Sequence, residues 1–327
     1  MPHRNKIKKI VIAGANAVGV DTARGAARLQ LAPSIVLLDP NEDRVRHAVA
    51  DIENTLAADG LLSPMVASTT WHHASGADIV VITAGRRFVA GESTWDDVLA
   101  ADPQEIERIA FEIKSHVRKA VVIVAADPGE VLVPLVQRVT AFPTRGVLGI
   151  QGELDRARLR SQIAREAGVA PARVSAHVFG GQGDAMVAPL SLARIDGVPL
   201  GAIVPPGTTS GMPLFKRVEI DAIVDRARQA GAELAGLAGA TEIHPAHVAV
   251  RLVDAVARNR REILSCTAIF EGQYRTAVGA CIALPVEVGT SGHWGVFPVD
   301  LTDREKDELE RASVLVADRA RGSRPGA

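Results

Sequence analysis

The chain has 327 residues and a mass of 34.4 kDa, a length typical of about two domains. Its 37 basic and 38 acidic residues leave a net charge of −1, and aromatic residues make up only 3%. Nucleic-acid backbones bind to basic surfaces and bases stack on aromatic side chains, so this composition excludes a nucleic-acid partner. With 47% hydrophobic residues, a chain of this length can form a core without disulfides or structural metals.

Cysteine content and hydropathy indicate the compartment. Cys266 and Cys281 are too few for a disulfide framework, and we expect both to be small buried side chains in a reducing compartment. The basic segment from Met1 to Lys9 leads into a short apolar run that contains Gly14, which predicts a strand and turn rather than a signal peptide. No apolar stretch reaches the roughly 20 residues of a membrane helix. We therefore expect a cytoplasmic protein without a membrane partner.

Short apolar runs alternate with helical patterns in the first half of the chain. The runs are rich in Val, Ile and Leu and lack polar alternation, which is typical of parallel strands buried on both faces. Helical patterns between them, including Asn41–Thr55 and Pro103–Val117, predict βαβ units and a Rossmann-type, doubly wound parallel sheet. The predicted strands are Ile7–Ala13, Ser34–Leu38, Ala77–Thr83, Ala120–Ala125 and Val147–Ile150.

The second half mixes longer helical patterns with signals for antiparallel strands. A Gly-Thr-Ser-Gly cluster at 289–292 predicts a turn between two strands. Thr302 and Glu305 form a capping box that opens a last helix ending near Asp318, and Gly168 is the expected stop of an earlier helix. The expected helices are Leu154–Ala167, Ala222–Leu237 and Pro245–Asn259, and the expected strands are Cys266–Phe270, Ala277–Pro285 and Trp294–Val299.

The first predicted strand runs into the turn GANAVG at 14–19, and a helical pattern follows. This is the context of a dinucleotide fingerprint, in which Gly14 makes the tight turn and Gly19 allows the helix to pack closely on the strand. Free N–H groups at the helix start, where Ala17 and Val18 lie, attract the pyrophosphate. Asn16 replaces the middle glycine and weakens the pattern, because its side chain lies where the backbone approaches the phosphates.

Asp39 ends the second predicted strand, 20 residues after Gly19. A carboxylate at this place hydrogen-bonds a ribose 2′-OH and repels a 2′-phosphate, so it favours NAD over NADP. The alternative is a solvated turn aspartate before Pro40. Together these features predict an α/β protein with an NAD-binding Rossmann domain at 1–149, an α+β substrate domain at 150–318 and a flexible tail at 319–327.

Several segments, by their order and spacing, resemble the lactate/malate dehydrogenase family over nearly the whole chain. They are VIAGANAVG at 11–19, VLLDPNEDR at 36–44, ADIVVITAG at 77–85, GELDRARLR at 152–160, FGGQGDAMV at 179–187 and FEGQY at 270–274. The resemblance implies an NAD-dependent oxidoreductase of 2-hydroxy and 2-oxo acids that forms a homodimer or homotetramer. It also implies that Ala84 and Gly85 lie against the cofactor and that residues 86–100 form a mobile loop over the site.

The resemblance also assigns residues to the reaction. Oxidation of a hydroxy acid removes a hydride from carbon and a proton from oxygen, and this family takes the proton with a His that an Asp orients. Asp155 matches that Asp, and Arg158, on the same face of one helix, matches the Arg that binds the substrate carboxylate. A surface ion pair is the alternative for these two residues. Thr241 matches a substrate-side Thr.

Other positions of the family pattern carry different residues here. Gln182 stands where the resemblance places the catalytic His, and an amide does not exchange a proton near neutral pH. Loss of such acid–base help costs roughly 10²–10⁴-fold in rate. Thr94 aligns with a loop Arg that polarises the carbonyl oxygen, and Phe88 with an Arg for a second carboxylate. Asp127, expected at the cofactor, aligns with an Asn.

These differences make the expected pocket more negative, since one Arg charge is lost and one Asp charge is gained. We therefore expect a small substrate with one carboxylate and a neutral or cationic remainder rather than a standard dicarboxylate. Arg86 and Arg87 on the same loop either offset part of this charge or face solvent.

Two functions stay open on these residues. The first is an NAD-dependent dehydrogenase with a remodelled site that acts on a CH–OH group, with His244 as candidate proton carrier. The alternative for His244 is a solvent-facing residue at a helix start, and His177 is expected in the core. The second function is an NAD(H)-binding protein without dehydrogenase activity, acting as a sensor or scaffold subunit. No ligand spacing indicates a metal.

Overall fold

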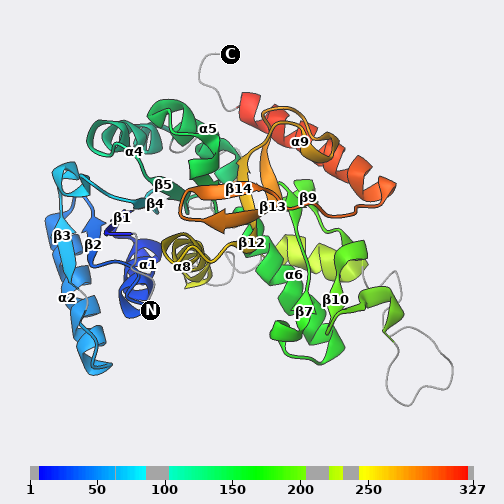
Figure 1. The fold of residues 1–327 in the computed structure, drawn as a ribbon, viewed down its shortest axis with the longest axis horizontal. Helices are drawn as coiled ribbons and strands as arrows, with labels where there is room; N and C mark the ends of the chain where they lie inside the picture. Colours follow the sequence, from blue (N-terminus) through cyan, green and yellow to red (C-terminus); the bar gives the residue numbers. More distant parts are fainter. Residues whose placement is uncertain (1–6, 63, 86–102, 204–220, 231–242, 323–327) are drawn as a thin grey trace.

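The computed structural model describes residues 7–62, 64–85, 103–203, 221–230 and 243–322 (Figure 1). Strands and helices alternate in its amino-terminal half, as the apolar runs predict. The elements of this half are β1 (Lys9–Ala13), α1 (Ala17–Arg28), β2 (Ser34–Leu38), α2 (Glu42–Ala58), β3 (Met65–Ser68), β4 (Ile79–Ile82), α4 (Pro103–His116), β5 (Val121–Val124), α5 (Gly129–Thr140) and β6 (Val147–Gly149).

Parallel strands of this half form a sheet in the order β3-β2-β1-β4-β5-β6. This order confirms the Rossmann-type, doubly wound fold that the sequence predicts, with its switch point between β1 and β4. The apolar pattern does not predict β3, because this strand is short and most of its side chains are only partly buried.

The strands bury side chains on both faces of the sheet. In β1, Ile10 and Ile12 belong to one core cluster, whereas Val11 and Ala13 belong to another. The same alternation recurs in β2, β4 and β5. Because both faces are covered, every position of these strands after the partly buried Lys9 of β1 and Ser34 of β2 is apolar, and the alternation of a half-exposed strand is missing from the sequence.

Helices cover the two faces of this sheet. Figure 1 shows α1 beside α8 (Ile243–Ala257) on one side and α4 beside α5 on the other. The contact between α1 and α8 is close because Gly25 has no side chain: a Cβ on it would lie 2.6 Å from Val250 Cγ2. A helix of the second half of the chain thus completes the cover of the first half's sheet.

The second half contains helices and mainly short antiparallel strands. Its elements are α6 (Gln151–Ala167), β7 (Val174–Ser175), β8 (Phe179–Gly180), β9 (Met186–Val187), β10 (Arg194–Ile195), β11 (Val198–Pro199), helical residues 221–230, α8, β12 (Glu262–Ile269), β13 (Cys281–Gly289), β14 (Gly292–Val296) and α9 (Asp303–Gly322). Short 3-10 helices lie at Trp71–Ala74, Thr144–Gly146, Pro171–Arg173, Gly183–Ala185, Leu190–Leu192, Leu200–Ala202 and Gln273–Arg275.

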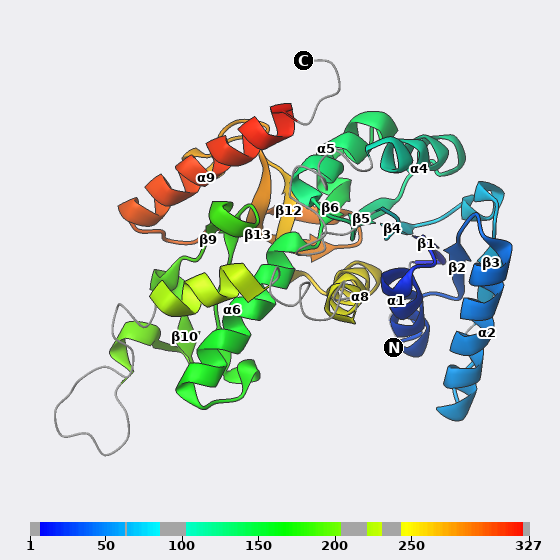
Figure 2. The same cartoon turned by 180° about the vertical axis from the view of Figure 1, so that it is seen from behind.

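The large sheet continues from the first half into the second. β6 pairs antiparallel with β12 at Gly149 and Thr267, and β13 then pairs with β12, β14 and β8. Gly289 pairs with Gly292 at the predicted turn between β13 and β14. Figure 2 shows α9 running beside β13 and β9. The antiparallel, α+β character predicted for this half is confirmed.

Helix ends follow the predicted capping residues. Gly168 ends α6 in the left-handed region with a φ of 64°, and Glu305 Oε2 accepts a hydrogen bond from Thr302 N at 2.9 Å at the start of α9. α9 continues to Gly322, so its predicted end near Asp318 is wrong and residues 319–322 are helical rather than part of a tail. Residues 231–237 of the predicted helix lie outside the described residues. Within the described ranges, no helix has the length and apolarity to cross a bilayer.

Candidate active site

The turn between β1 and α1 has no room for side chains at its glycines. Gly14 has a φ of +115°, and a Cβ on it would lie 2.7 Å from Ala84 N. A Cβ on Gly19 would lie 1.8 Å from Gly14 O and 2.7 Å from Thr83 Oγ1. The Thr83 hydroxyl donates to Gly14 O at 2.9 Å. The backbones of β1, α1 and the end of β4 therefore approach as closely as the dinucleotide fingerprint requires.

Both polar groups of the Asn16 side chain bind to the protein itself. Oδ1 accepts a hydrogen bond from Gly19 N at 2.9 Å and caps α1, while Nδ2 donates to Thr83 O at 2.6 Å. The N–H groups of Ala17 and Val18 lie in the first turn, where no helix carbonyl can accept from them. The start of α1 therefore still offers donors to a pyrophosphate, and the turn fits NAD although the middle glycine is missing.

Asp39 lies at the carboxyl end of β2 and is 5% exposed. Its Oδ2 accepts a hydrogen bond from Ala15 N at 2.8 Å, and its Oδ1 accepts one from Asn41 N at 3.0 Å. Arg44 lies 3.7 Å from Oδ2. The carboxylate thus stands beside the glycine turn, where a ribose contact is expected, and it also anchors that turn through Ala15.

The carboxyl ends of β4 and β5 lie next to each other at the same edge. Gly85 has a φ of +113°, and its Cβ position is 3.7 Å from Ala126 Cβ. Asp127 follows Ala126 and precedes a cis peptide bond to Pro128. Gln151 Nε2 donates to Ala126 O at 2.8 Å and to Asp127 Oδ1 at 3.1 Å. Gln151, which the sequence patterns do not single out, therefore holds Asp127 at this edge.

Asp155 and Arg158 form an ion pair on α6, with Arg158 Nη1 2.6 Å from Asp155 Oδ1. Burial raises the pKa of the Asp155 carboxyl, the charge of Arg158 opposes this, and the charge of Asp127 adds to it. Arg158 is largely buried, and its Nε has no hydrogen-bond partner among the described residues. A buried guanidinium with an unused donor matches the carboxylate-binding role that the resemblance implies.

Gln182 is held through both of its backbone polar groups. Its N–H donates to Glu130 Oε1 at 3.2 Å, and its carbonyl accepts from Arg319 Nη1 at 3.4 Å. The side-chain Oε1 is buried and has no partner within the described part of the chain. The amide that stands at the predicted catalytic position is therefore placed by α5 on one side and α9 on the other.

Glu130 and Arg319 are neighbours of Gln182 that the sequence patterns do not indicate. Glu130 is 4% exposed, and burial raises its pKa, with a further contribution from the charge of Asp127 and opposition from Arg319. An acidic residue in the first turn of a helix is usually exposed to solvent, where its charge interacts favourably with the positive end of the helix dipole. The position of Glu130 three residues after Asp127 is the only local signal, since Gln182 and Arg319 lie far away in the chain.

His244 lies in the first turn of α8 and is half-buried. Burial, the charge of Arg158 and His247 together lower the pKa of its imidazole from 6.5 to about 4. His244 therefore lies within electrostatic range of Arg158, and its ring is neutral at pH 7. Thr94, Thr241 and the loop residues 86–100 lie outside the described residues.

The remaining candidates are structural. Cys266 and Cys281 are free and buried, as expected, and burial raises the pKa of both thiols. His177 is partly buried near Arg156, and burial and this charge lower its pKa to about 4. No group of three or more His, Cys, Asp or Glu side chains is placed to hold a metal ion in the described ranges.

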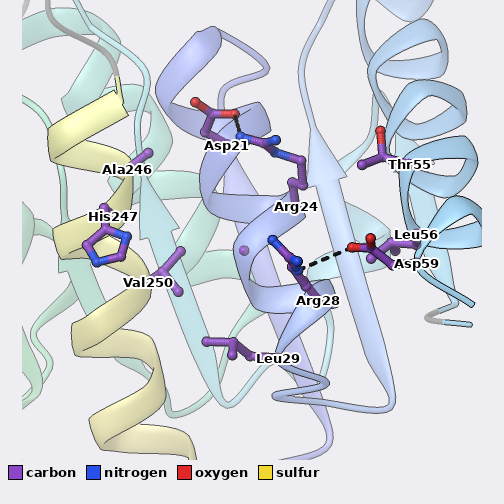
Figure 3. A pocket seen from close by; sticks show the side chains of 11 residues that line it. Asp21, Arg24, Arg28, Leu29, Thr55, Leu56, Asp59, Ala246, His247 and Val250 are labelled. Atoms are coloured by element: carbon purple, nitrogen blue, oxygen red, sulfur yellow. Dashed lines mark hydrogen bonds and ion pairs between the residues drawn. The ribbon is translucent and has the colours of Figure 1, made fainter. Parts of the chain in front are cut away.

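A groove of about 300 Å³ lies between α1, α2 and α8, away from these residues (Figure 3). Arg28 pairs with Asp59 at 3.2 Å across it, while Val250 of α8 and Leu56 of α2 contribute apolar walls. None of its lining residues is a site residue predicted from the sequence, so it is distinct from the candidate active site.

Comparisons with known proteins identify the family of this chain. Residues 8–149 match the model of the lactate/malate dehydrogenase NAD-binding domain, and residues 152–318 match that of the family's alpha/beta C-terminal domain. A malate dehydrogenase of Myxococcus xanthus is 32% identical over 94% of this chain and 95% of its own length. One of Chloroherpeton thalassium is 30% identical over 93% and 95%, respectively.

Solved structures show the same fold. The lactate dehydrogenase of Cryptosporidium parvum, complexed with lactic acid and nicotinamide adenine dinucleotide, has a TM-score of 0.88 at 27% identity and covers 97% of this chain and 98% of its own. The malate dehydrogenase of that organism has a TM-score of 0.90 at 26% identity, over 97% and 99%. The chain therefore belongs to the lactate/malate dehydrogenase family and is an NAD-dependent oxidoreductase of that type.

Proposed function

We propose that this protein transfers a hydride between NAD and a hydroxy or oxo acid in a remodelled site, and that its substrate is not a standard dicarboxylate. The observation that carries this proposal is Arg158. Its guanidinium is buried, Asp155 holds it through one nitrogen, and its Nε is unused by the described residues. A substrate carboxylate supplies the missing acceptor, and a planar guanidinium fits its two oxygens.

The residues of this site have distinct roles in the proposal. Arg158 binds the carboxylate, and Asp155 keeps the guanidinium in place. NAD, when bound, would supply the hydride-transfer chemistry. His244, neutral at pH 7, takes the hydroxyl proton during oxidation and passes it to solvent. Gln182 cannot take that proton, but its amide hydrogen-bonds the substrate oxygen and orients it.

Site electrostatics support the choice of substrate. Three carboxyl groups lie near one another in the proposed site, those of Asp127, Glu130 and Asp155. The charge of Asp127 contributes to the raised pKa of the Glu130 and Asp155 carboxyls. Arg158 and Arg319 are the cations that oppose them in the described part of the site. A second substrate carboxylate would meet this negative field, whereas a neutral or cationic remainder would not.

The test is NADH consumption with a panel of 2-oxo acids that includes oxaloacetate, pyruvate and longer monocarboxylates with neutral or amine-bearing side chains. We expect turnover with a monocarboxylate and at least tenfold lower kcat/KM with oxaloacetate. Arg158→Lys loses the planar fork and should raise KM at least tenfold, whereas Arg165→Lys, on an exposed part of the same helix, should not. Faster turnover of oxaloacetate would refute the substrate assignment.

The alternative function is an NAD(H)-binding protein without dehydrogenase activity, and the amide of Gln182 favours it. The double variant Gln182→His, Thr94→Arg separates the two functions. Activity that is already present in the parent excludes the alternative. Activity that arises only in the double variant, with NAD bound equally by both proteins, excludes the enzyme.

The proposal extends to assembly and domains. We propose that the chain consists of a Rossmann domain at 1–149 and a substrate domain from residue 150. We also propose that it forms a homodimer or homotetramer, and light scattering after size-exclusion chromatography tests this assembly. A mass near 34.4 kDa would refute it, since that is the mass of one chain.

A further inference from the structure

Asp127 differs from the other charged groups of the site, because no described cation pairs with it. Asp155 pairs with Arg158, and the charge of Arg319 opposes Glu130. The Asp127 carboxylate instead accepts a hydrogen bond from the neutral Gln151 amide, on Oδ1 at 3.1 Å. Asp127 lies close enough to Glu130 and Asp155 for its charge to contribute to the raised pKa of both carboxyls.

The strand order puts Asp127 on the nicotinamide side of the cofactor. β1 lies between β2 and β4, and β5 follows β4. The adenosine ribose belongs at Asp39 after β2 and the pyrophosphate at the start of α1, so the rest of the dinucleotide extends toward the ends of β4 and β5. Strands are spaced by about 4.8 Å, so β5 lies only about 10 Å from β1. Gly85 and Asp127 follow β4 and β5 at this edge.

We propose that Asp127 shifts the cofactor preference of this protein toward the oxidised form, NAD⁺, relative to NADH. The proposal rests on the function proposed above and goes beyond it, because it concerns the choice between the two redox forms. The nicotinamide ring of NAD⁺ carries a positive charge, and the ring of NADH is neutral. A carboxylate that has no cationic partner among the described residues attracts the charged ring and gains nothing from the neutral one.

The expected size of this preference follows from Coulomb's law. Two unit charges about 6 Å apart in an effective dielectric of about 40 change an affinity about tenfold. Glu130 and Asp155, the acids near Asp127, are only 4% and 5% exposed. Dissolved salt therefore screens the attraction between the Asp127 carboxylate and the nicotinamide ring less than it would at an exposed site. A tenfold preference makes the potential of the bound couple about 30 mV more negative. Compared with a site that has a neutral residue here, the ratio of bound NAD⁺ to bound NADH is then about ten times higher, which favours the form that receives a hydride from a hydroxy acid.

The test is a calorimetric measurement of Kd for NAD⁺ and for NADH. Asp127→Asn removes the charge but keeps an oxygen that accepts from Gln151, and Asp127→Glu keeps the charge. Asp196→Asn is the control for net charge, since Asp196 is exposed, pairs with Arg173 and lies between β10 and β11. We expect the ratio of Kd(NADH) to Kd(NAD⁺) to fall about tenfold in Asp127→Asn and to stay within twofold in the other two variants.

An unchanged ratio in Asp127→Asn would overturn the inference, and so would an equal fall in Asp196→Asn. If circular dichroism shows that Asp127→Asn does not fold, Asp127→Ser is the second neutral variant, with the same expectation. Binding of both forms combined with no turnover of any hydroxy or oxo acid would contradict the proposed function but leave this ratio measurable. Failure of the wild-type protein to bind either form would overturn both.

Discussion

The carboxylate of Glu153 anchors α6, the helix that carries Asp155 and Arg158, and its replacement by Gln should destabilise the protein strongly. Glu153 is 1% exposed. It accepts hydrogen bonds from Arg156 Nη1 at 3.1 Å, from Arg251 Nη1 at 2.9 Å and from Ser265 N at 3.1 Å. An amide in its place removes the negative charge that faces the two guanidinium groups. Its NH₂ group, itself a donor, would also face the N–H donors of these arginines or of Ser265. Breaking a buried ion pair in this way costs about 3–5 kcal/mol.

Urea denaturation followed by circular dichroism measures this loss as a change in the free energy of unfolding. The matched control is Glu42→Gln, the same chemical change in an exposed pair on α2, where Arg46 lies 3.3 Å from Glu42. Exposed i,i+4 pairs contribute about 0.3–0.5 kcal/mol, so the control should change little. If Glu153→Gln costs no more than Glu42→Gln, burial does not make this network important and the reasoning is refuted.

Other consequences concern the glycine turn and two histidines. Gly19→Ala should abolish NAD binding in a titration and lower the melting temperature, because the added Cβ would lie 1.8 Å from Gly14 O. Normal NAD binding by this variant would contradict the close approach of the α1 and β1 backbones at Gly19. Burial and Arg145 lower the pKa of His293 to about 4, so between pH 6.5 and 4 the unfolded state binds a proton that the folded state excludes. The free energy of unfolding should therefore fall as pH falls through this window, and less so in His293→Asn, as urea titrations at several pH values would show. If His244 carries the proton with a pKa of about 4, kcat/KM for oxidation should stay constant from pH 8 to about 5, because the ring is neutral throughout this range. Over the same range, kcat/KM for reduction should rise as the pH falls, because reduction requires the protonated ring. A bend near pH 6.5 in either profile would exclude His244 as the proton carrier.

The contacts around Gln182 explain how the proposed site could keep its shape with an amide at the position where the resemblance places a His. Glu130 and Arg319 hold the peptide groups on the two sides of the residue and do not depend on its side chain. The substitution therefore changes what the side chain can do chemically without removing the contacts that position it.

Local patterns in the sequence predicted most of the fold because those patterns reflect local physics. Continuous runs of Val and Ile predict buried parallel strands, Gly14 and Gly19 mark a turn without room for Cβ atoms, and Gly168 ends a helix in the left-handed region. The missed β3 and the late end of α9 at Gly322 show the limits of these patterns, since neither has a distinctive local signal.

Only the tertiary structure decided which charges meet. Glu130, Gln182 and Arg319 come from distant parts of the chain, and their contacts exist because α5, the segment after β8, and α9 converge on one edge of the sheet. The resemblance aligns Asp127 with an amide of the family pattern, but it does not indicate that Gln151 is the neutral partner of Asp127 while the neighbouring acids have cations. Electrostatic balance depends on distances across the fold, and residue order along the chain does not contain those distances.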